Sequence, residues 1–396
     1  MTEAADAHRF DAGLAAWIVD QSLAAGTFQS VLEGIGGRLC EAGLPLRRIF
    51  VAMPMISPDL RAGVATWDRL TGFVGTGVRH DDGPDDFLHS PFKHMLDDGV
   101  RWRRWRPSAV ASSGYGILDR LAGEGITDYL AHLVDFDPTQ ARTMRGAAVS
   151  FASDHPAGFG PDQVSRLSGF APVLGLSALR FATTFLVDEI LGRYVGRRAG
   201  ERILRGEIRR GDGHMLSAAI VFADLRGFTR LADKAGAGLV SRLGRHLAAM
   251  AEPVEEQGGE VLKILGDGLL ATFAIEGDDP SVACRAALAA AREALRRNAA
   301  VNADLPGEEP LALDVALHRG EVFYGNIGAG SRLDFTVIGP AVNECSRIER
   351  LCEAFDRPLL MSAAFAGCCG APVRSLGPHV LRGVAEPREI FALAEP

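Results

Sequence analysis

The segment Phe-Ala-Asp-Leu-Arg-Gly-Phe-Thr at residues 222–229 places a carboxylate at the end of an apolar run. Residues 217–225 are predicted to form a buried strand, and a carboxylate there is costly unless it binds a cation or is well hydrogen-bonded. Asp224 is therefore a candidate metal ligand. The strand leads through a turn at Gly227 into a predicted helix, and free backbone N–H groups at such a turn bind phosphate oxygens. In the alternative interpretation, Asp224 and Thr229 only cap the helix.

A second candidate lies in the segment Lys-Ile-Leu-Gly-Asp-Gly at residues 263–268. Two apolar strands joined through Gly-Asp-Gly form a tight hairpin, because glycine supplies the backbone angles that the turn requires. Asp267 lies at its tip, where an aspartate would ordinarily be an unremarkable turn residue. Lys263 lies in the preceding strand, where a buried ammonium needs a partner. Taken alone, neither segment is specific.

A third segment, Thr-Val-Ile-Gly-Pro-Ala-Val-Asn-Glu-Cys-Ser-Arg at 336–347, completes an ordered set of motifs. In this order the three segments resemble the class III adenylate and guanylate cyclase catalytic domain. The resemblance covers about residues 215–394 and includes the flanking segments at 317–328 and 381–391. The GGDEF signature of the related diguanylate cyclases is absent, since the Gly-Gly-Glu at 258–260 lacks its remainder.

The resemblance implies a site for two Mg²⁺ or Mn²⁺ ions, held by Asp224 and Asp267 with help from the Leu225 carbonyl. Such ions activate an attacking oxygen and offset the charge of the phosphate and its leaving group. The attacking group would be the ribose 3′-hydroxyl, the target the α-phosphorus and the leaving group pyrophosphate. Substrate contacts are also expected at the turn formed by Gly227, Phe228 and Thr229.

Two side chains of the third segment match residues that act on the ribose and the phosphate in this family. Asn343 matches the ribose-orienting Asn, and Arg347 matches the Arg that stabilises the transition-state phosphate. They are four residues apart on a predicted helix and share a face, and an Arg fork suits phosphate oxygens. Without the motif, Arg347 would be interpreted as a surface ion pair with Glu344 or Glu349. A further cation follows near the C-terminus: Arg382 stands where family members often place a triphosphate-binding Lys.

The choice of base follows from Lys263 and Thr336. In this family Lys with Asp or Thr accompanies adenine, whereas Glu with Cys accompanies guanine. Adenine offers an acceptor at N1 and a donor at N6, which match a Lys donor and a Thr acceptor. A mispaired buried polar group costs about 1–3 kcal/mol, so ATP is the expected substrate and cyclic AMP the product, with guanylate cyclase as an alternative.

In this family the metal aspartates come from one subunit and the base and ribose residues from the other. This chain carries both sets, so the resemblance implies a head-to-tail homodimer with two equivalent composite sites. A different class of function is a degenerate, catalytically weak nucleotide-binding regulatory module. Such a module would normally lack a metal Asp or the Arg, and this sequence retains both.

From Met215 onward, apolar strands alternate with helices. We expect a strand at 217–225, a helix at 228–257, a hairpin at 260–274 and an Ala-rich helix at 280–300. Two more strands over 311–328, a helix at 341–355 and a closing strand at 389–393 follow. The fold class is therefore α+β, with a mixed, mainly antiparallel sheet covered by helices; the resemblance makes this a ferredoxin-like cyclase domain.

The first 160 residues show a different order of elements. Helices are predicted at 9–24, 27–42, 85–98 and 114–123, and strands at 47–55, 62–70, 100–106, 127–136 and 144–153. This order resembles the GAF and PAS small-molecule sensor folds and implies an α/β GAF-like regulatory domain. All four Trp lie here, which suits a ligand pocket or, as we favour for each, an ordinary core. The Trp-Arg-Arg-Trp at 102–105 is interpreted as a charged edge strand rather than an anion site.

A long helix over about 162–206 is expected to join the two parts. Its apolar residues have mixed spacings that suggest a dimer helix without a clean heptad, and its basic, glycine-punctuated end suits a hinge or a plain linker equally. We therefore predict a regulatory domain at 1–160, a signalling and dimerisation helix with linker at 161–212, and a catalytic domain at 213–396. Residues 170–187 are as long as the shortest bilayer-spanning helix, but Arg180 near the middle favours a partly buried helix without a membrane span.

Bulk composition bounds the remaining functions. The formal net charge of −8 gives no support to nucleic-acid or anionic-membrane binding. The N-terminus lacks a basic region followed by an apolar run, so no signal peptide is expected. Six cysteines show no metal-site spacing, and the adjacent Cys368 and Cys369 are interpreted as small buried apolar residues in preference to a redox pair. A reduced, cytoplasmic protein is expected, regulated by an unknown small molecule or protein.

Overall fold

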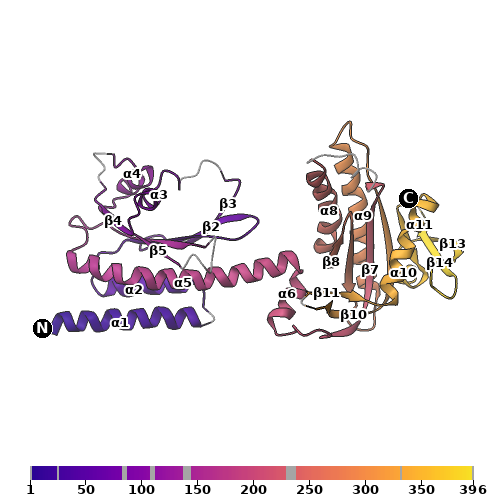
Figure 1. Cartoon of the computed structure of the whole chain (residues 1–396), viewed down its shortest axis with the longest axis horizontal. Helices are drawn as coiled ribbons and strands as arrows, with labels where there is room; N and C mark the ends of the chain where they lie inside the picture. The colour runs from indigo at the N-terminus through magenta and orange to yellow at the C-terminus, as the bar shows by residue number, and fades with distance from the viewer. Residues whose placement is uncertain are drawn as a thin grey trace. The chain divides into compact units, whose positions relative to one another are not determined.

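The computed structural model describes residues 2–24, 26–82, 87–107, 112–136, 144–228, 238–330 and 332–394. The chain forms two compact units, Met1–Ile190 and Leu191–Pro396. Figure 1 follows the chain through both units. Each unit has its own sheet and core, so each is described by itself.

The N-terminal unit is built on a six-stranded antiparallel sheet with the strand order β3-β2-β1-β6-β5-β4. Its strands are β1 (Arg48–Pro54), β2 (Leu60–Asp68), β3 (Gly72–Arg79), β4 (Trp102–Trp105), β5 (Asp128–Asp135) and β6 (Gly146–Ser153). Its helices are α1 (Thr2–Leu23), α2 (Phe28–Glu41), α3 (Pro91–Asp97), α4 (Gly116–Gly123) and α5 (Pro161–Tyr194).

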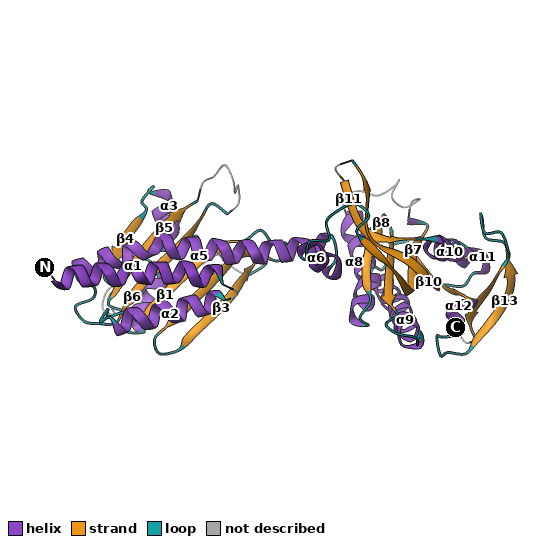
Figure 2. Cartoon of the chain, turned by 90° about the horizontal axis from the view of Figure 1, so that it is seen from below, coloured by secondary structure: helices purple, strands orange, loops and turns teal. Residues whose placement is uncertain are grey.

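Helices cover both faces of this sheet (Figures 1 and 2). Apolar side chains of α1, α2 and α5 form the larger core with one face, around Ile35 and Phe151. Side chains of α3 and α4, including Met95 and Leu118, form a smaller core on the other face. Helices therefore bury both faces of the central strands, whereas β3 at the edge of the sheet is largely exposed.

The predicted helices and strands of this unit are present, but α1 begins at Thr2 instead of residue 9, and there are two further differences. Strand β3 was not predicted, because its sequence Gly-Phe-Val-Gly-Thr-Gly-Val-Arg is half open to solvent and rich in glycine, which is depleted in strands. Helix α3 begins only at Pro91, after the capping residue Ser90.

The arginines around β4 are bound to carboxylates. Arg104 donates from Nε and Nη2 to Asp128, whose side chain is fully buried. Arg103 pairs with Asp98 at 3.0 Å. These pairs satisfy the arginines within the unit and agree with a charged edge strand rather than an anion site.

The expected single helix over 162–206 is wrong: it is two helices, α5 (Pro161–Tyr194) and α6 (Arg197–Leu204). Gly196 separates them with a φ of 98°, a backbone conformation that a helix does not contain and that side chains disfavour. The first half of α5 packs in the core through Leu167, Phe170 and Leu174. By length and composition alone, α5 could cross a membrane, and 39 % of its most apolar window is buried among the described residues.

The C-terminal unit contains an eight-stranded sheet with the order β13-β14-β12-β10-β7-β9-β8, and β11 pairs with β10. Its strands are β7 (Gly213–Arg226), β8 (Glu260–Leu265), β9 (Gly268–Ala274), β10 (Ala312–Ala329), β11 (Arg332–Ile338), β12 (Leu359–Ser362), β13 (Val373–His379) and β14 (Arg388–Leu393). Besides α6, the described helices are α8 (Gly238–Glu256), α9 (Ser281–Ala303), α10 (Pro340–Glu349), α11 (Leu351–Phe355) and α12 (Ala363–Ala366). The pairing of β10 with β12 is parallel and the other pairings are antiparallel, so the mixed α+β fold is confirmed.

Strand β7 shows how the sheet separates two cores. Its odd-numbered residues, such as Val221, pack with α8, α9 and α12, and even-numbered ones, such as Ile220, pack with α6, α10 and α11. This alternation follows from the two-residue period of a strand. Asp224 belongs to the even-numbered set, so its side chain lies on the face that α10 covers.

Some predicted boundaries in this unit are wrong. Residues 312–329 form one continuous strand instead of two, because Gly320 is tolerated within a strand that is paired with β7 from Ala312 to Gly325. The helix expected at 341–355 is divided into α10 and α11 at Arg350. Strands β11, β12 and β13 were not predicted; β12 has only four residues, too few to show a period.

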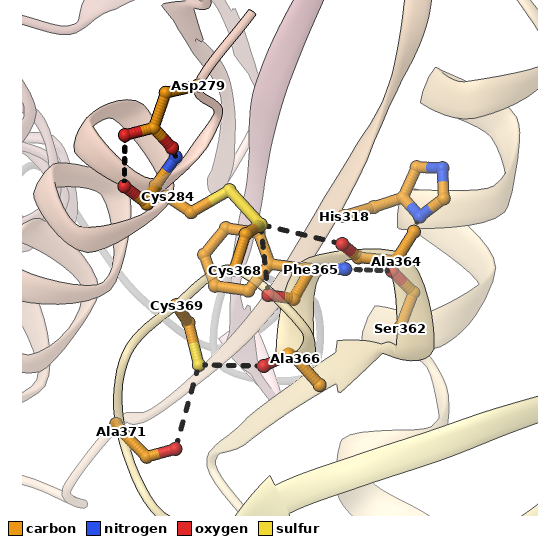
Figure 3. The surroundings of a disulfide bond; sticks show 11 residues. Asp279, Cys284, His318, Ser362, Ala364, Phe365, Ala366, Cys368, Cys369 and Ala371 are labelled. Atoms are coloured by element: carbon orange, nitrogen blue, oxygen red, sulfur yellow. Dashed lines mark hydrogen bonds between the residues drawn. A yellow bond between two sulfur atoms is a disulfide. The ribbon is translucent and has the colours of Figure 1, made fainter.

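A disulfide joins Cys284 of α9 to Cys368, which follows α12 (Figure 3). Their Cα atoms are 6.0 Å apart although the residues are 84 positions apart in sequence. Cys369 is a free, buried thiol, as expected, but Cys368 is not simply an apolar core residue. Spacing in sequence cannot identify such a pair, since strands β10, β11 and β12 separate its two residues along the chain.

Candidate active site

Asp224 lies near the end of β7, in the middle of three paired strands. Its register partners are Asp314 on β10 and Gly268 on β9. A Cβ atom at position 268 would lie 2.5 Å from Asp224 Oδ1. Glycine at 268 therefore leaves the space that the Asp224 carboxylate occupies, and this explains the second glycine of the Gly-Asp-Gly turn.

Carboxylates crowd around Asp224. Its pKa is raised to about 6, first by burial and then by the negative charges of Asp267 and Asp314. The pKa of Glu349, on α10, is raised to about 7 by burial and by the charges of Asp224 and Asp314. The structure thus brings the two predicted metal ligands close enough for their charges to interact, and such a site favours a cation.

The donor set at this point is small. Among the residues that the structure describes, no group of three or more His, Cys, Asp and Glu side chains could hold a metal ion. The Leu225 N–H donates a hydrogen bond to the Asp224 carboxylate. Asp224 and Asp267 would therefore bind a hard divalent cation together with backbone, substrate or water oxygens, the ligands such ions prefer.

Asp314 and Arg226 were missed by the sequence interpretation. Arg226 Nε and Nη2 donate to Asp314 at 2.9 and 2.6 Å, a bidentate pair beside Asp224. The pair offsets part of the negative charge at the site and fixes the strand end that carries Asp224. The arginine of the Asp-Leu-Arg-Gly motif was a signal, because an Arg two residues after a buried Asp needs a carboxylate of its own.

The turn after β7 is only partly described. Gly227 has a φ of 81°, which is the left-handed region that glycine adopts without strain. The Phe228 side chain is 8 % exposed and packs in the core, so only its backbone could contact a ligand. Thr229 lies outside the described residues.

Lys263 and Thr336 lie on strands that approach each other, β8 and β11. Lys263 Nζ forms an ion pair with Asp334, which shares a face of β11 with Thr336. Thr336 is buried, and Lys263 is 43 % exposed. The sequence interpretation missed Asp334, although its position two residues before Thr336 and the need of Lys263 for a partner were both visible.

Asn343 and Arg347 lie on α10 as predicted, with Asn343 exposed and Arg347 partly buried. Arg347 has no ion pair among the described residues, so the alternative interpretation, a surface pair with Glu344 or Glu349, does not hold there; Glu344 is bound to Arg388 at 3.4 Å. A Cβ atom at Gly383 would lie 3.5 Å from Arg347 Nη2. The loop carrying Arg382, which is exposed, therefore lies against the guanidinium of Arg347.

Comparison with known proteins shows what the C-terminal unit is similar to. Residues 214–356 match the family model of the adenylate and guanylate cyclase catalytic domain, and this range contains the candidate metal, base and ribose residues.

Curated relatives show the same similarity. An adenylate cyclase of Anabaena cylindrica is 31 % identical over 144 residues, which are 36 % of this chain and 29 % of the relative. An uncharacterized protein of Mycobacterium tuberculosis is 32 % identical over 212 residues, 52 % of this chain and 38 % of the relative. The chain thus spans 29–38 % of the length of these relatives.

Solved structures are similar to a part of the chain. The adenylyl cyclase CyaB from P. aeruginosa has 24 % identity and a TM-score of 0.43, over 46 % of this chain and 96 % of that one. The guanylyl cyclase Cya2 has 27 % identity and a TM-score of 0.41 over the same shares. From the family model and the motifs that the fold brings together, residues 214–356 belong to the adenylate and guanylate cyclase catalytic domain family.

Proposed function

We propose that this protein is an adenylate cyclase that converts ATP to 3′,5′-cyclic AMP and pyrophosphate. The observation that carries the proposal is the proximity of Asp224 and Asp267, whose charges interact, within the part of the chain that matches the cyclase catalytic domain. The family membership supports a lyase acting on a nucleoside triphosphate. The choice of ATP rests on the chemistry of the base contacts.

Asp224 and Asp267 would hold Mg²⁺ or Mn²⁺, two ions in the proposed mechanism, with the Leu225 carbonyl as a further ligand. The residues fit such a group, because burial and then the charges of neighbouring carboxylates raise the pKa of Asp224, and a divalent cation would offset both effects. When bound, the ions lower the pKa of the ribose 3′-hydroxyl and neutralise phosphate charge.

The remaining steps belong to side chains and backbone of this chain. Backbone N–H groups at the turn after β7 would bind phosphate oxygens, and Arg382 would contact the triphosphate. Asn343 would orient the ribose so that its 3′-oxygen faces the α-phosphorus. The guanidinium of Arg347, which has no carboxylate partner among the described residues, would stabilise the charge that develops as the new P–O bond forms and pyrophosphate leaves.

Adenine would be recognised by Lys263 and Thr336. The Lys263 ammonium donates to adenine N1, and the Thr336 hydroxyl accepts from the N6 amino group. Asp334 supports this arrangement, since its ion pair with Lys263 directs the ammonium along β11. Guanine would present a donor at N1 to the same ammonium, and the mismatch is expected to lower its use by about ten- to a hundredfold.

A head-to-tail homodimer is the proposed active form, with each site composed of residues from both chains. Large apolar side chains surround the base-recognising strands and are exposed in the single chain: Ile264, Leu265, Leu333 and Ile338. Exposed apolar side chains of this kind suit burial against a second copy.

The N-terminal unit is proposed to be a GAF-like regulatory domain that responds to a small molecule or a protein. Its six-stranded antiparallel sheet with helices on both faces supports this proposal, as do the exposed apolar side chains on the second half of α5, Phe185 and Ile190, which suit a dimer helix. Cytoplasmic signal transduction would be the corresponding role.

The test is a substrate competition assay on the purified full chain. ATP and GTP are supplied together with Mg²⁺ or Mn²⁺, and cyclic AMP, cyclic GMP and pyrophosphate are separated and quantified. We expect cyclic AMP and an equal amount of pyrophosphate, with cyclic GMP lower by at least about tenfold. Mainly cyclic GMP would contradict the choice of base, and no cyclic product from either nucleotide would favour a nucleotide-binding module.

A further inference from the structure

Strand β8 begins with a buried carboxylate that the proposed reaction does not use. Glu260 is 9 % exposed. Tyr324 Oη donates to both carboxylate oxygens, at 3.1 and 2.9 Å, and the backbone N–H of Ala199 donates to Oε1 at 3.2 Å. Burying a carboxylate is costly, and the pKa of Glu260 is raised by that burial.

Ala199, whose N–H donates to Glu260, lies in the first turn of helix α6. The residue before this helix is Gly196, which has no side chain to accept the free N–H groups of the first turn. Glu260 supplies an acceptor from another element, and its negative charge is favourable near the positive end of the helix dipole. A side chain of β8 thus performs the capping that the sequence of α6 lacks.

A second contact joins α6 to the same region. The Arg202 guanidinium lies 5.4 Å from the ring centre of Tyr324 and 5.9 Å from that of Phe335, within cation–π range. Arg202 is held by Glu207, with Nε donating at 2.8 Å. The two rings themselves are 4.9 Å apart in an edge-to-face arrangement.

These contacts end at the residues assigned to base recognition. Phe335 lies between Asp334 and Thr336 on β11. Glu260 precedes Lys263 by three positions on β8, and the register of this strand shifts between Val261 and Lys263. Both strands that carry the base-recognising side chains are therefore attached to α6.

We propose that Glu260 is a positioning residue, which fixes Lys263 and Thr336 for base recognition by docking the first turn of α6 onto β8 and Tyr324. The inference rests on the proposed function of Lys263 and Thr336. Glu260 lies outside the proposed metal and phosphate contacts, and the inference gives it a part in the discrimination between ATP and GTP.

The physical consequence is a dependence of base selectivity on α6. Removing the Glu260 carboxylate leaves the Ala199 N–H and the Tyr324 hydroxyl without their acceptor, which costs free energy. Strand β8 and the ring pair of Tyr324 and Phe335 then lose a common anchor. Base recognition is sensitive to such shifts, because small misplacements strongly weaken oriented contacts.

The experiment uses the full chain with Glu260→Ala. We expect the ratio of kcat/KM for ATP to that for GTP to fall about five- to tenfold, the factor of roughly one lost hydrogen bond. The kcat at saturating ATP should change less than about twofold, because the residues assigned to metal and phosphate are untouched. Hydrogen exchange of the amides of α6, starting at Ala199, should accelerate.

Three further variants separate positioning from general damage. Glu260→Gln keeps an oxygen that accepts from the Ala199 N–H, so it should retain most of the selectivity. Tyr324→Phe removes one donor and should lower selectivity in the same direction by a smaller factor. Glu321→Gln, at an exposed position on β10, is the matched control and should behave as the natural chain.

A folded Glu260→Ala protein with unchanged selectivity would overturn the proposal. If that variant does not fold, Tyr324→Phe decides, and unchanged selectivity there overturns it as well. Equilibrium binding of ATP and GTP to the same variants measures the effect on base selectivity independently of turnover. A natural chain that forms no cyclic product would contradict the proposed function alone, while equal effects of Glu260→Ala on ATP and GTP binding would contradict the positioning role.

Discussion

Asp224 is the residue at which the electrostatics of the site concentrate. Its carboxylate is partly buried between β9 and β10, and Asp267 and Asp314 add their negative charges. The folded protein therefore disfavours the ionised form of Asp224 when no cation is present. The crowded carboxylates thus lower the stability of the metal-free protein, as is common where a site is arranged to bind a ligand.

Asp224→Asn should stabilise the metal-free protein and abolish cyclase activity. The pKa of Asp224 is raised from 3.8 to about 6, so the folded chain binds this proton more tightly than the unfolded chain. The natural protein therefore gains stability as the pH falls from above about 6 to about 4. At about pH 8 in the presence of a chelator, the variant should be more stable by about 1–3 kcal/mol, measured by denaturant unfolding.

The pH dependence supplies the control for this prediction. Below about pH 4, Asp224 is protonated in both states and the advantage of the variant should disappear. Asp278→Asn, at an exposed position, should change neither stability nor activity. A variant that is less stable than the natural protein at about pH 8 would show that the carboxylates are not crowded.

Most of the candidate site residues were identifiable in the sequence, because their motifs depend on local backbone. The Gly-Asp-Gly turn and the strand end at Asp224 are local features. Asp314 and Asp334 were not identified, since each acts through a residue on another strand, Arg226 and Lys263 respectively. Such pairs are set by strand register and by packing between strands, which the motifs do not contain.

Helix α6 shows how an element can depend on a distant strand. Its eight residues are too few for a stable isolated helix. Gly196 allows the chain to leave α5 with a φ of 98° and a ψ of 149°, a region almost confined to glycine. The first turn is then capped by Glu260.

Gly196→Ala should destabilise the docking of α6. The new Cβ forces an unfavourable backbone conformation, with an expected cost of about 1–3 kcal/mol. Hydrogen exchange of residues 197–204 should accelerate, and the midpoint of thermal unfolding should fall.

Gly192→Ala is the matched control, four residues earlier and within α5. A Cβ at that position meets no atom within 4 Å, and alanine favours a helix over glycine by about 1 kcal/mol. It should leave the protein unchanged or slightly more stable. Equal behaviour of the two variants would mean that the break between α5 and α6 does not require glycine.

At the level of elements, the sequence predicted those with a clear apolar period or cap, such as α2, α9 and the β8–β9 hairpin. It failed for β3 and β12, where glycine content or four-residue length hides the period. It also merged α5 with α6, since the basic residues of 197–205 continue a helical composition. Composition alone does not reveal a reversal of φ at one glycine.

At the scale of the whole molecule, one chain carries the aspartates and the residues proposed for base, ribose and phosphate. A head-to-tail dimer would combine them into two equivalent sites. Both sites would depend on contact between two chains, so the activity should depend on protein concentration.

Mixing Asp224→Ala chains with Arg347→Ala chains should restore activity. Each variant alone should be inactive, but a mixed dimer would contain one site with neither substitution. At equal concentrations, random pairing would make half of the dimers mixed, and each mixed dimer would hold one intact site of two. The expected recovery is therefore about one quarter of the natural activity, measured as cyclic AMP formed.

Two controls accompany the mixing experiment: each variant is mixed with more of itself, and the mixture is diluted. Each variant mixed with more of itself should remain inactive, and the recovered activity should fall on dilution. No recovery in the mixture, with both variants folded, would contradict the composite site.

The sequence by itself determined the chemistry: the aspartates, the lysine, the arginine and their order indicate a cyclase domain, because the types and local spacing of these residues decide what they can bind. Only the tertiary structure decided which charges act on one another. Strand register brings Asp314 beside Asp224, and packing brings Asp334 to Lys263, Glu260 to the first turn of α6 and Cys284 to Cys368. These contacts join residues from different elements, and their free energy depends on burial and distance, which exist only once the chain has folded.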